Sequence, residues 1–397
     1  MVNHFPLEGS GSGTYTKNIA MALVALGHEV CIVMPENSSA FPQIAGVKLH
    51  PVYFSPEDGS AAPDGALPFD FPCFTTHPRS TTTFSDLDAA QFEAYMQAFS
   101  HALEDEAREF GPDVVHGQHV WVLSALAARL GLPLVLTAHG TDLMGYAQWP
   151  QLRAYPDECM DAASAVVTIS KDNHELVETT FPQHAHKALM MSNGYSSQVF
   201  FQSHIDRAEL LGGYGVAYSG ERFVLFAGKL THFKGVDVLL DACALYEQQT
   251  DDIITVIAGD GAERGNLEEQ SARLGLTNVH FIGNVSQSEL QKLYACADVD
   301  LVPSRNEAFG LVAIEAMACG TPVVASNGGG LPDFVNSSVG ALVAPEDPDD
   351  LARGIVETLD RALANRAWRD DIASYAAGNY SQAVIIRELD ELYRTVA

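Results

Sequence analysis

Positively charged side chains are scarce in this sequence. Its 397 residues include 22 Lys and Arg against 51 Asp and Glu, which gives a formal net charge of −29. Nucleic-acid binding needs Lys and Arg to replace phosphate counterions, and anionic membrane surfaces attract basic patches. The composition therefore argues against both partners. Residues 1–200 are net −14 and residues 201–397 net −15, so the acidity belongs to the whole surface. Either general solubility or attraction of a cationic substrate explains it.

Cysteines and long apolar runs are also few. The six cysteines form no Cys-x-x-Cys pair, which predicts buried, reduced thiols and neither a disulfide framework nor a zinc site. No apolar run reaches the ~18 residues of a membrane span. The first residues have no basic-then-apolar signal. We therefore expect a cytoplasmic protein without a transmembrane segment.

Apolar residues make up 47% of the chain, which indicates a globular protein, and the length fits two domains. Short β-branched runs alternate with amphipathic stretches, the pattern of an α/β fold with parallel sheets wrapped by helices. The predicted strands are 29–34, 48–53, 114–116, 134–138, 165–169, 223–227, 253–258, 279–282, 299–302, 322–325 and 341–343. The predicted helices are 15–26, 89–109, 122–129, 171–180, 236–247, 263–274, 287–295, 312–318, 347–364 and 382–396.

The two series of elements predict an N-terminal Rossmann-like domain over 1–200 and a C-terminal one over 201–381. The polar, glycine-containing stretch 196–220 is the best linker candidate. The long helix at the C-terminus is amphipathic enough to leave the second domain and pack elsewhere. Eight residues precede the first glycine-rich turn, so the first strand is either very short or lost to a late start codon.

The glycine-rich turn Gly9-Ser-Gly-Ser-Gly13 is expected to enter a helix at Thr14. Backbone N–H groups at such a helix start can face an anion or a closely approaching ligand. A tight turn without a ligand explains the glycines equally well. The turn lacks the Gly-x-Gly-x-x-Gly spacing of a dinucleotide site.

Two of the seven lysines follow the strand 223–227. Lys229 stands at its end, and Lys234-Gly235 opens the next helix. Ligands of open α/β sheets bind at the carboxyl ends of strands, so these two lysines predict an anion site. The alternative is a pair of solvated surface lysines.

The segment from Glu307 to Glu315 follows the strand 299–302. Phe309-Gly310-Leu311 is expected to start a helix, whose free N–H groups and dipole suit a phosphate. Glu307 precedes this helix, and Glu315 lies about one and a half turns into it. A phosphate at the helix start would therefore have a carboxylate on either side. Two unrelated surface glutamates would give the same spacing.

These residues resemble the donor-site signature of the retaining glycosyltransferases of family 4. The resemblance rests on Glu307-x7-Glu315 with Phe309-Gly310 inside it and Gly320-Thr321-Pro322-Val323 after it. Further motifs follow in the family's order over nearly the full chain: Gly27-His28-Glu29-Val30, Pro112-Asp113-Val114-Val115-His116, His139-Gly140-Thr141-Asp142, Asn193-Gly194, Gly228-Lys229-Leu230, Gly259-Asp260-Gly261 and Phe281-Ile282-Gly283.

The resemblance implies the GT-B architecture, in which two Rossmann-like domains with parallel sheets face a central cleft. The nucleotide-sugar donor would bind the C-terminal domain and the acceptor mainly the N-terminal one. The last helix, 382–397, would cross back to join the first domain. The donor diphosphate would be held by Lys229 and Lys234 and by N–H groups of Phe309, Gly310, Leu311 and Val312.

The resemblance also implies roles for the remaining candidate residues. Glu315 would bind the nucleotide ribose, and Glu307 would contact hydroxyls of the donor sugar. His139 would lie beside the donor sugar at the reaction centre, so that His139 and Glu307 are the expected catalytic residues. The turn at Gly11 and Gly13 would approach the diphosphate, and Asn284 and Val285 would contact the base.

The expected activity is a retaining glycosyl transfer from a nucleotide-diphosphate sugar to a hydroxyl acceptor. Two lysines and a helix N-terminus can stabilise the departing diphosphate without a metal, and no Asp-x-Asp-like pair stands at a plausible site. We therefore expect no metal and no cofactor beyond the donor, and front-face attack on the donor. A sugar synthase or phosphorylase and a non-catalytic sugar-binding partner are the alternatives. The acidic N-terminal half favours a soluble or polymeric acceptor over a lipid.

Overall fold

The computed structural model describes residues 1–41, 43–56, 61–75, 77–250 and 252–397. It divides into two compact units, one of Met1–Ser192 with Ile385–Ala397 and one of Asn193–Val384. The stretch 196–220 lies wholly in the second unit, so its interpretation as a linker was wrong. It contains helix α7 (Arg207–Gly213). The guanidinium of Arg207 anchors this helix through two 2.8 Å hydrogen bonds to Asp298.

A seven-stranded parallel sheet forms the first unit, in the order β3-β2-β1-β4-β5-β6-β7. The five predicted strands are present, shifted by at most two residues at either end. The central β1 is two residues long, so of the two alternatives for the first strand the very short one is confirmed. The short, half-exposed edge strand β7 adds to the expected set. The strands are β1 Val2–Asn3, β2 Val30–Glu36, β3 Val47–Tyr53, β4 Val115–Gln118, β5 Leu134–Ala138, β6 Ala165–Thr168 and β7 Ala188–Met190.

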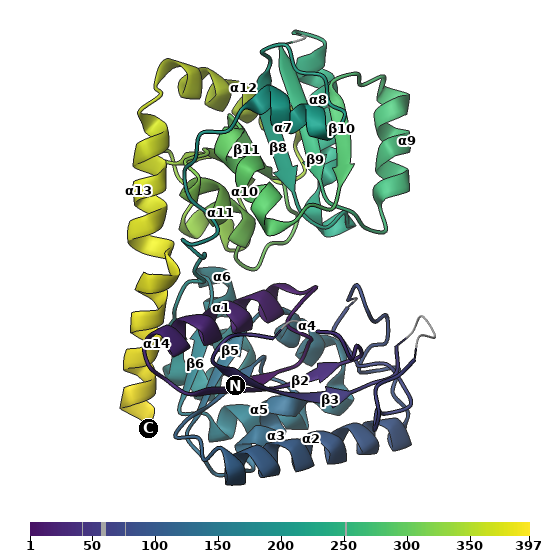
Figure 1. Ribbon diagram of the computed structural model, residues 1–397, viewed down its shortest axis with the longest axis vertical. Helices are drawn as coiled ribbons and strands as arrows, with labels where there is room; N and C mark the ends of the chain where they lie inside the picture. The colour runs from purple at the N-terminus through teal and green to yellow at the C-terminus, as the bar shows by residue number, and fades with distance from the viewer. Residues whose placement is uncertain (42, 57–60, 76, 251) are drawn as a thin grey trace. The chain divides into compact units, whose positions relative to one another are not determined.

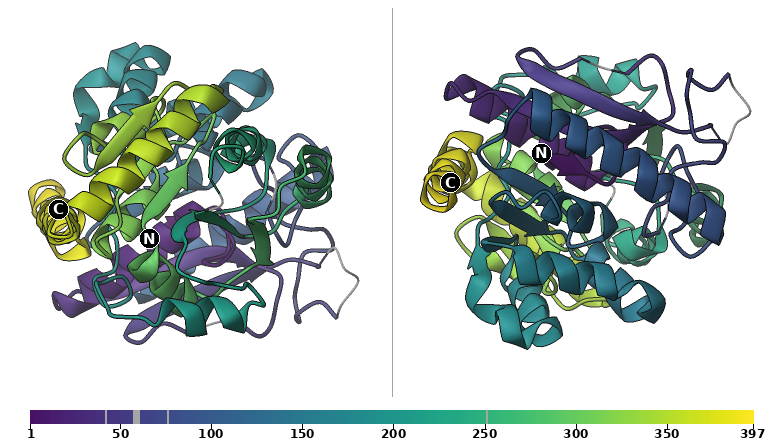
Figure 2. Two further views of the ribbon diagram at one scale, coloured as in Figure 1. Left: turned by 90° about the horizontal axis from the view of Figure 1, so that it is seen from above. Right: turned by 90° about the horizontal axis from the view of Figure 1, so that it is seen from below.

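Helices cover both faces of this sheet because its strands alternate buried side chains between them. In β5, Leu134 and Leu136 pack toward α2, α3 and α5, whereas Val135 packs toward α1 and α14. Figure 1 shows α2, α3 and α5 on one face and α1 on the other, and Figure 2 (right) shows α2 lying across its face. The helices are α1 Gly11–Ala25, α2 Ala89–Glu109, α3 Val122–Ala128, α4 Thr141–Gln148, η1 Pro150–Leu152, α5 Ala154–Ala162, α6 Lys171–Thr180, η2 Pro182–Lys187 and α14 Gln382–Val396.

Sequence patterns missed helices α4 and α5 of the first unit. Glycine and proline interrupt the apolar periodicity between residues 140 and 162, so no 3.6-residue repeat is visible there. Helix α2 was predicted with its observed bounds. Its start is fixed by a capping box, in which Asp88 and Gln91 each bond the other's backbone N–H.

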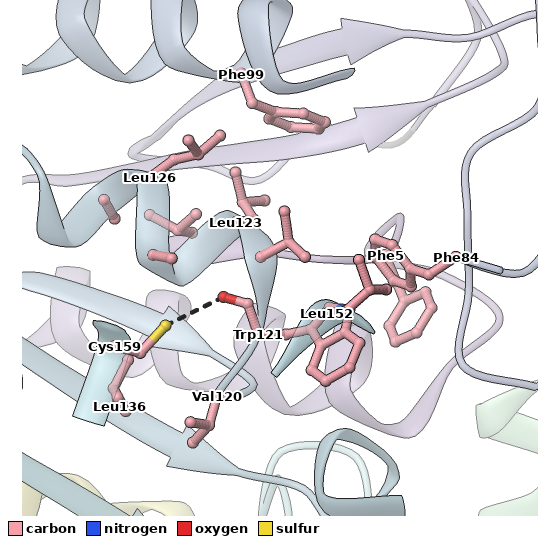
Figure 3. Packing of buried hydrophobic residues seen from close by; sticks show 14 of the residues in the cluster. Phe5, Phe84, Phe99, Val120, Trp121, Leu123, Leu126, Leu136, Leu152 and Cys159 are labelled. Carbon is pink, nitrogen blue, oxygen red and sulfur yellow. Dashed lines mark hydrogen bonds between the residues drawn. The ribbon is translucent and has the colours of Figure 1, made fainter. Parts of the chain in front are cut away.

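Large aromatic side chains fill the core between the first sheet and α2, α3 and α5 (Figure 3). Trp121 and Phe99 are fully buried, and the Trp121 ring packs edge-on against Phe84 with centroids 5.8 Å apart. The Sγ of Cys159 donates to the carbonyl of Trp121 at 3.2 Å. All six cysteines are buried thiols, as their spacing predicted.

The second unit has a six-stranded parallel sheet in the order β10-β9-β8-β11-β12-β13. Its six predicted strands are present, two of them with the expected bounds. The strands are β8 Arg222–Ala227, β9 Ile253–Ala258, β10 Val279–Gly283, β11 Val299–Val302, β12 Val323–Ser326 and β13 Gly340–Val343. The helices are η3 His232–Lys234, α8 Val236–Glu247, α9 Arg264–Leu274, α10 Gln287–Cys296, α11 Leu311–Ala318, η4 Leu331–Asp333, α12 Pro348–Ala364 and α13 Trp368–Tyr380, besides α7. Helix α13 was missed because its apolar residues form no continuous stripe.

Residues of α14 from Ile385 onward belong to the first unit, where polar contacts tie them to the sheet. The ring of His116 on β4 bonds the Tyr393 hydroxyl at 2.5 Å and the Thr137 hydroxyl at 2.7 Å. His28 contacts Asp390 at 2.8 Å. These bonds connect residues far apart in sequence, so α14 is an integral layer of this unit.

A cavity of about 490 Å³ lies at the amino ends of β1, β2 and β4 in the first unit. Its lining includes Met1, Cys31, Glu106, Val115 and Tyr393. The amino ends of the strands are the edge opposite to that at which α/β sheets bind ligands.

None of the helices in the described ranges is both long and apolar enough to cross a membrane.

Buried histidines make the first unit sensitive to acid. Burial lowers the pKa of His4 and of His116 to about 3, from an ordinary 6.5. The unfolded chain therefore binds protons that the folded chain excludes, and stability falls as the pH drops below about 6.5. At pH 5 the loss is about 2 kcal/mol for each histidine.

We predict that His116→Gln reduces this acid sensitivity. The variant is less stable than wild type at pH 7.5, but it loses about 2 kcal/mol less between pH 7.5 and pH 5. Urea unfolding followed by tryptophan fluorescence measures the difference. His101→Gln, at an exposed position of α2, is the control and should behave as wild type. Equal losses in all three proteins would contradict the prediction.

Candidate functional site

Three loops at the carboxyl ends of β8, β9 and β10 pack backbone against backbone. The N–H of Gly228 donates to Ala258 and that of Gly259 to Gly283, at 3.0 and 2.8 Å. A Cβ at Gly259 would lie 1.9 Å from the carbonyl oxygen of Gly228, so a side chain there would separate the loops. Lys229 projects from this packed edge and is exposed. The edge therefore presents an ammonium group to solvent on a rigid support.

Lys234 and Glu307, which come from different loops, are in direct contact. The Nζ of Lys234, at the end of η3, lies 2.6 Å from Oε2 of Glu307, and the hydroxyl of Ser304 donates to the same oxygen at 3.3 Å. The two side chains are 27% and 14% exposed. The structure thus brings together two residues that the sequence predicted for one site.

Arg305 holds both of these loops, and sequence reasoning missed it. Its guanidinium donates two 2.7 Å hydrogen bonds to Asp237 at the start of α8 and a third to the carbonyl of His232 in η3. The bonds to Asp237 raise the pKa of Arg305. The sequence offered one signal for it, a basic residue three positions after β11 in a chain with few bases.

Helix α11 begins at the expected glycine. Gly310 is its N-cap with φ of 103°, a left-handed conformation that favours glycine. A Cβ there would also lie 2.6 Å from the Leu331 side chain. Phe309 is buried and packs on Phe334, with ring centroids 5.2 Å apart. The first-turn N–H groups that follow, including those of Leu311 and Val312, have no acceptor within the helix.

Glu315 lies in the second turn of α11 and is 9% exposed. Burial raises the pKa of its carboxyl to about 8. No described residue donates a hydrogen bond to this carboxyl group. A buried carboxyl without a partner is costly, so the position is one where ligand hydroxyls would be stabilising.

Two further buried polar groups lie near Glu315 and were not predicted. Both carboxyl oxygens of Asp300 on β11 and the hydroxyl of Tyr294 on α10 are buried without a hydrogen-bond partner among the described residues. Burial raises the pKa of Asp300 well above its usual range, and the charge of Glu315 adds to the effect. Buried polar groups without hydrogen-bond partners among the described residues therefore gather where α11 packs on β11 and α10.

Asn284 and Val285 lie in the loop between β10 and α10. Asn284 is exposed and Val285 partly exposed. Ser286 caps α10 directly after them, so the loop leaves the same edge of the sheet as the loop of Lys229.

In the first unit, Gly11 and Gly13 lie within the first turn of α1, which begins at Gly11 and not at the expected Thr14. The hydroxyl of Ser10 accepts the Gly13 N–H at 3.0 Å, so this N–H is used within the helix cap. A Cβ at Gly13 would meet the Pro6 carbonyl oxygen at 2.5 Å, whereas one at Gly11 would meet nothing within 4 Å. Gly13 is thus required by packing, and Gly11 is not.

His139 follows β5, partly exposed. Its Nε2 lies 2.9 Å from Oε1 of Gln118, and its ring packs on His119 and Tyr15 with centroids 4.6 and 5.2 Å apart. Burial lowers the pKa of His139 to about 3, and the charge of the neighbouring His4 is a second, smaller cause. The imidazole is therefore neutral at physiological pH.

Asp142 has a structural role at the start of α4. It is fully buried, and its carboxylate accepts N–H groups of Val120, Leu143 and His139 at 2.8, 3.1 and 3.2 Å. These bonds join the ends of β4 and β5. Gln118, like Arg305, was missed, although a polar residue closing a buried strand was a usable signal.

Within the described ranges, no group of three or more His, Cys, Asp or Glu side chains has the arrangement of a metal site.

Two family models match the chain in succession. The model described as Glycosyltransferase Family 4 matches residues 9–198, and the model described as Glycosyl transferases group 1 matches residues 215–377. Each model thus falls almost entirely within one structural unit.

Solved structures share the fold. A sucrose-phosphate synthase from Thermosynechococcus elongatus has a TM-score of 0.74 at 22% identity, and HepE of Anabaena in complex with UDP-glucose has 0.73 at 20%. Both alignments cover 99% of this chain and 98% of the other.

The sequence of a glycosyltransferase from Methanocaldococcus jannaschii is 32% identical over 302 residues, 71% of this chain and 75% of the relative. That relationship, together with the paired models, shows that the chain belongs to the family 4 type of glycosyltransferases with the GT-B fold.

Proposed function

We propose that this glycosyltransferase moves a hexosyl group from a nucleotide-diphosphate sugar to an acceptor hydroxyl, with retention of configuration and without a metal ion. The contact that carries the proposal is the 2.6 Å pair of Lys234 and Glu307. It sets a cation and a carboxylate side by side at the edge of the second sheet, in the order that the family signature gives them. Such a pair can bind a phosphate and a sugar hydroxyl at once.

The donor diphosphate is assigned to Lys229, Lys234 and the N–H groups of Phe309, Gly310, Leu311 and Val312. Negative charge develops on the departing diphosphate as the glycosidic bond breaks. Two ammonium groups and the positive end of a helix dipole stabilise that charge through preorganised donors. They supply the electrostatic role that a divalent cation has in other transferases.

Glu315 is assigned to the nucleotide ribose and Glu307 to the donor sugar. The Glu315 carboxyl is buried and receives no hydrogen bond from any residue that the structure describes, and two ribose hydroxyls would satisfy it. This assignment turns a costly buried group into a binding group. Asn284 and Val285 are assigned to the base, and Gly11 and Gly13 to the approach of the α1 turn to the diphosphate.

The transfer step is a front-face displacement. The acceptor oxygen forms its bond to the anomeric carbon on the face from which the phosphate oxygen leaves. That phosphate oxygen takes the acceptor proton, so neither a protein nucleophile nor a protein base is required. His139, held neutral by burial, acts as a hydrogen-bonding group toward the transferred sugar.

UDP-glucose is the first donor to test, because it is bound in the Anabaena structure of the same fold. We propose a soluble or polymeric acceptor, since residues 1–200 carry a net charge of −14 whereas anionic membranes attract basic surfaces. The proposed location is the cytoplasm, where nucleotide sugars and reduced thiols coexist.

Titration calorimetry with UDP, GDP and ADP, followed by a panel of their sugars, tests the donor assignment. We expect one nucleotide to bind, and Lys234→Ala to weaken it roughly 10–100-fold, the effect of a lost charge-assisted hydrogen bond. Lys292→Ala, at an exposed position of α10, is the control and should leave the affinity unchanged. Failure of all three nucleotides to bind the wild type would refute the proposal.

The stereochemistry and the metal requirement are tested on the product. We expect the anomeric proton of the first-formed glycoside to show the configuration of the donor by NMR, and EDTA to leave the initial rate within about twofold. Inversion, or loss of activity that Mg²⁺ or Mn²⁺ restores, would contradict those parts of the proposal. Activity that requires inorganic phosphate would identify a phosphorylase instead.

Glu315→Gln should separate binding from stability. Because burial raises its pKa from 4.5 to about 8, ionisation opposes folding increasingly from pH 4.5 upward and fully above pH 8. The neutral amide removes that penalty, so we expect a higher Tm at pH 9, by roughly 2–4 °C per kcal/mol. Nucleotide affinity should nevertheless fall about tenfold. Glu357→Gln, at an exposed site of α12, should change neither; a lower Tm or intact affinity in Glu315→Gln would argue against the assignment.

A further inference from the structure

We propose that Gln118 is the positioning residue of His139: its side-chain oxygen holds the imidazole as the Nε2–H tautomer and leaves Nδ1 as a hydrogen-bond acceptor. The catalytic consequence rests on the proposed function, in which His139 contacts the transferred sugar. The tautomer itself is a property of the first unit and can be measured without any transferase assay.

The contact is short and fully buried on the glutamine side. Gln118 closes β4 with no exposed surface, and His139 follows β5, which pairs with β4 in parallel register. Oε1 of Gln118 lies 2.9 Å from Nε2 of His139. With the amide in this orientation its oxygen can only accept, so the Nε2 of His139 carries the proton.

The main-chain carbonyl of Gln118 fixes two further imidazoles. It accepts from Nδ1 of His4 and from Nδ1 of His119, both at 2.7 Å. The Nε2 of His4 in turn accepts the Leu123 N–H at 3.0 Å, which requires the Nδ1–H tautomer of His4. Gln118 therefore fixes the tautomers of three histidines through its main-chain and side-chain oxygens.

The backbone at this point is held in an unusual conformation. His119 has φ of 84°, in the left-handed region, and its ring lies 4.6 Å from that of His139. Such a conformation costs about 1–3 kcal/mol in a non-glycine residue and persists where surrounding contacts require it. The hydrogen bond from His119 to Gln118 is one such contact.

Because the imidazole is neutral, its tautomer decides whether Nδ1 of His139 can accept a hydrogen bond. Burial lowers the pKa of His4, His119 and His139, so each imidazole has one donor and one acceptor nitrogen. No described residue bonds the Nδ1 of His139. That nitrogen is then available to accept a hydroxyl proton of the sugar, which the other tautomer could not do.

The amide of Gln118 is what selects between the two tautomers. In the part of the chain that the structure describes, its Nε2 is buried without a partner. Rotation of the amide by 180° would place that donor on His139 and force the proton to Nδ1. Only the orientation with Oε1 toward the ring gives the proposed acceptor at Nδ1.

Imidazole ¹⁵N–¹H correlation spectra at pH 8 measure the tautomer directly, with His139→Gln used for assignment. The wild type should show His139 as Nε2–H. Gln118→Met keeps the volume and removes the oxygen, and it should give a mixture of tautomers or Nδ1–H. Gln118→Glu retains an acceptor as an ionised carboxylate and should keep Nε2–H. Wild-type protein with Nδ1–H, or Gln118→Met with unchanged Nε2–H, overturns the proposal.

Gln291→Met is the matched control for loss of a buried glutamine. Gln291 lies in the second unit, 6% exposed, and donates to the Phe201 carbonyl at 2.8 Å and the Ser203 hydroxyl at 2.9 Å. Its loss should leave the His139 signal unchanged.

Kinetics then test the consequence for catalysis. Gln118→Met should lower kcat about tenfold with little change in donor KM, as for an interaction made in the transition state, and Gln118→Glu should recover most of the rate. A changed tautomer with unchanged kcat overturns the catalytic part of this proposal. Absence of any transfer by the wild type would refute the proposed function, while the spectra still decide the tautomer.

Discussion

Parallel strand pairing is the constraint on which both units depend. Every pair of strands in the two sheets is parallel, so all carboxyl ends of a sheet meet at one edge. Loops that are far apart in the sequence therefore converge there. In the second unit this edge collects Lys229, Lys234, Glu307 and the start of α11, and in the first unit it collects Gln118 and His139. The polar residues of interest lie at these ends because the central strands are buried on both faces and are mostly apolar.

Scarce positive charge is largely committed to specific partners. Lys234 pairs with Glu307, Arg305 with Asp237 and Arg207 with Asp298, each at 2.6–2.8 Å. Each pair joins a segment next to β8 to a segment next to β11. The cations therefore hold these segments together, and they are also candidate ligand groups. Lys229 differs, since it is exposed at a glycine-packed edge. Against an acidic background, a single ammonium on a rigid loop gives a strong local contrast for an anionic ligand.

Repetitive local signals made most of the fold predictable from sequence. Helices 89–109 and 236–247 and strands 253–258 and 299–302 have their predicted bounds, because apolar periodicity and capping residues are local. The helices between residues 140 and 162 lack that periodicity and were missed. Lys234, Glu307 and Glu315 were recognisable from a motif within a few residues. Gln118 and Arg305 belong to no such motif. A polar residue that ends a buried strand and a base shortly after one could have marked their positions, but their roles depend on contacts 21 and 68 residues away.

The cavity at the amino ends of β1, β2 and β4 gives the first unit a mechanical character of its own. It is open to solvent, has a volume of about 490 Å³ and lies beside a central strand of only two residues. Few backbone hydrogen bonds can hold β2 and β4 together through so short a strand. Local opening of the sheet, with water entering between the strands, therefore costs least at this amino edge.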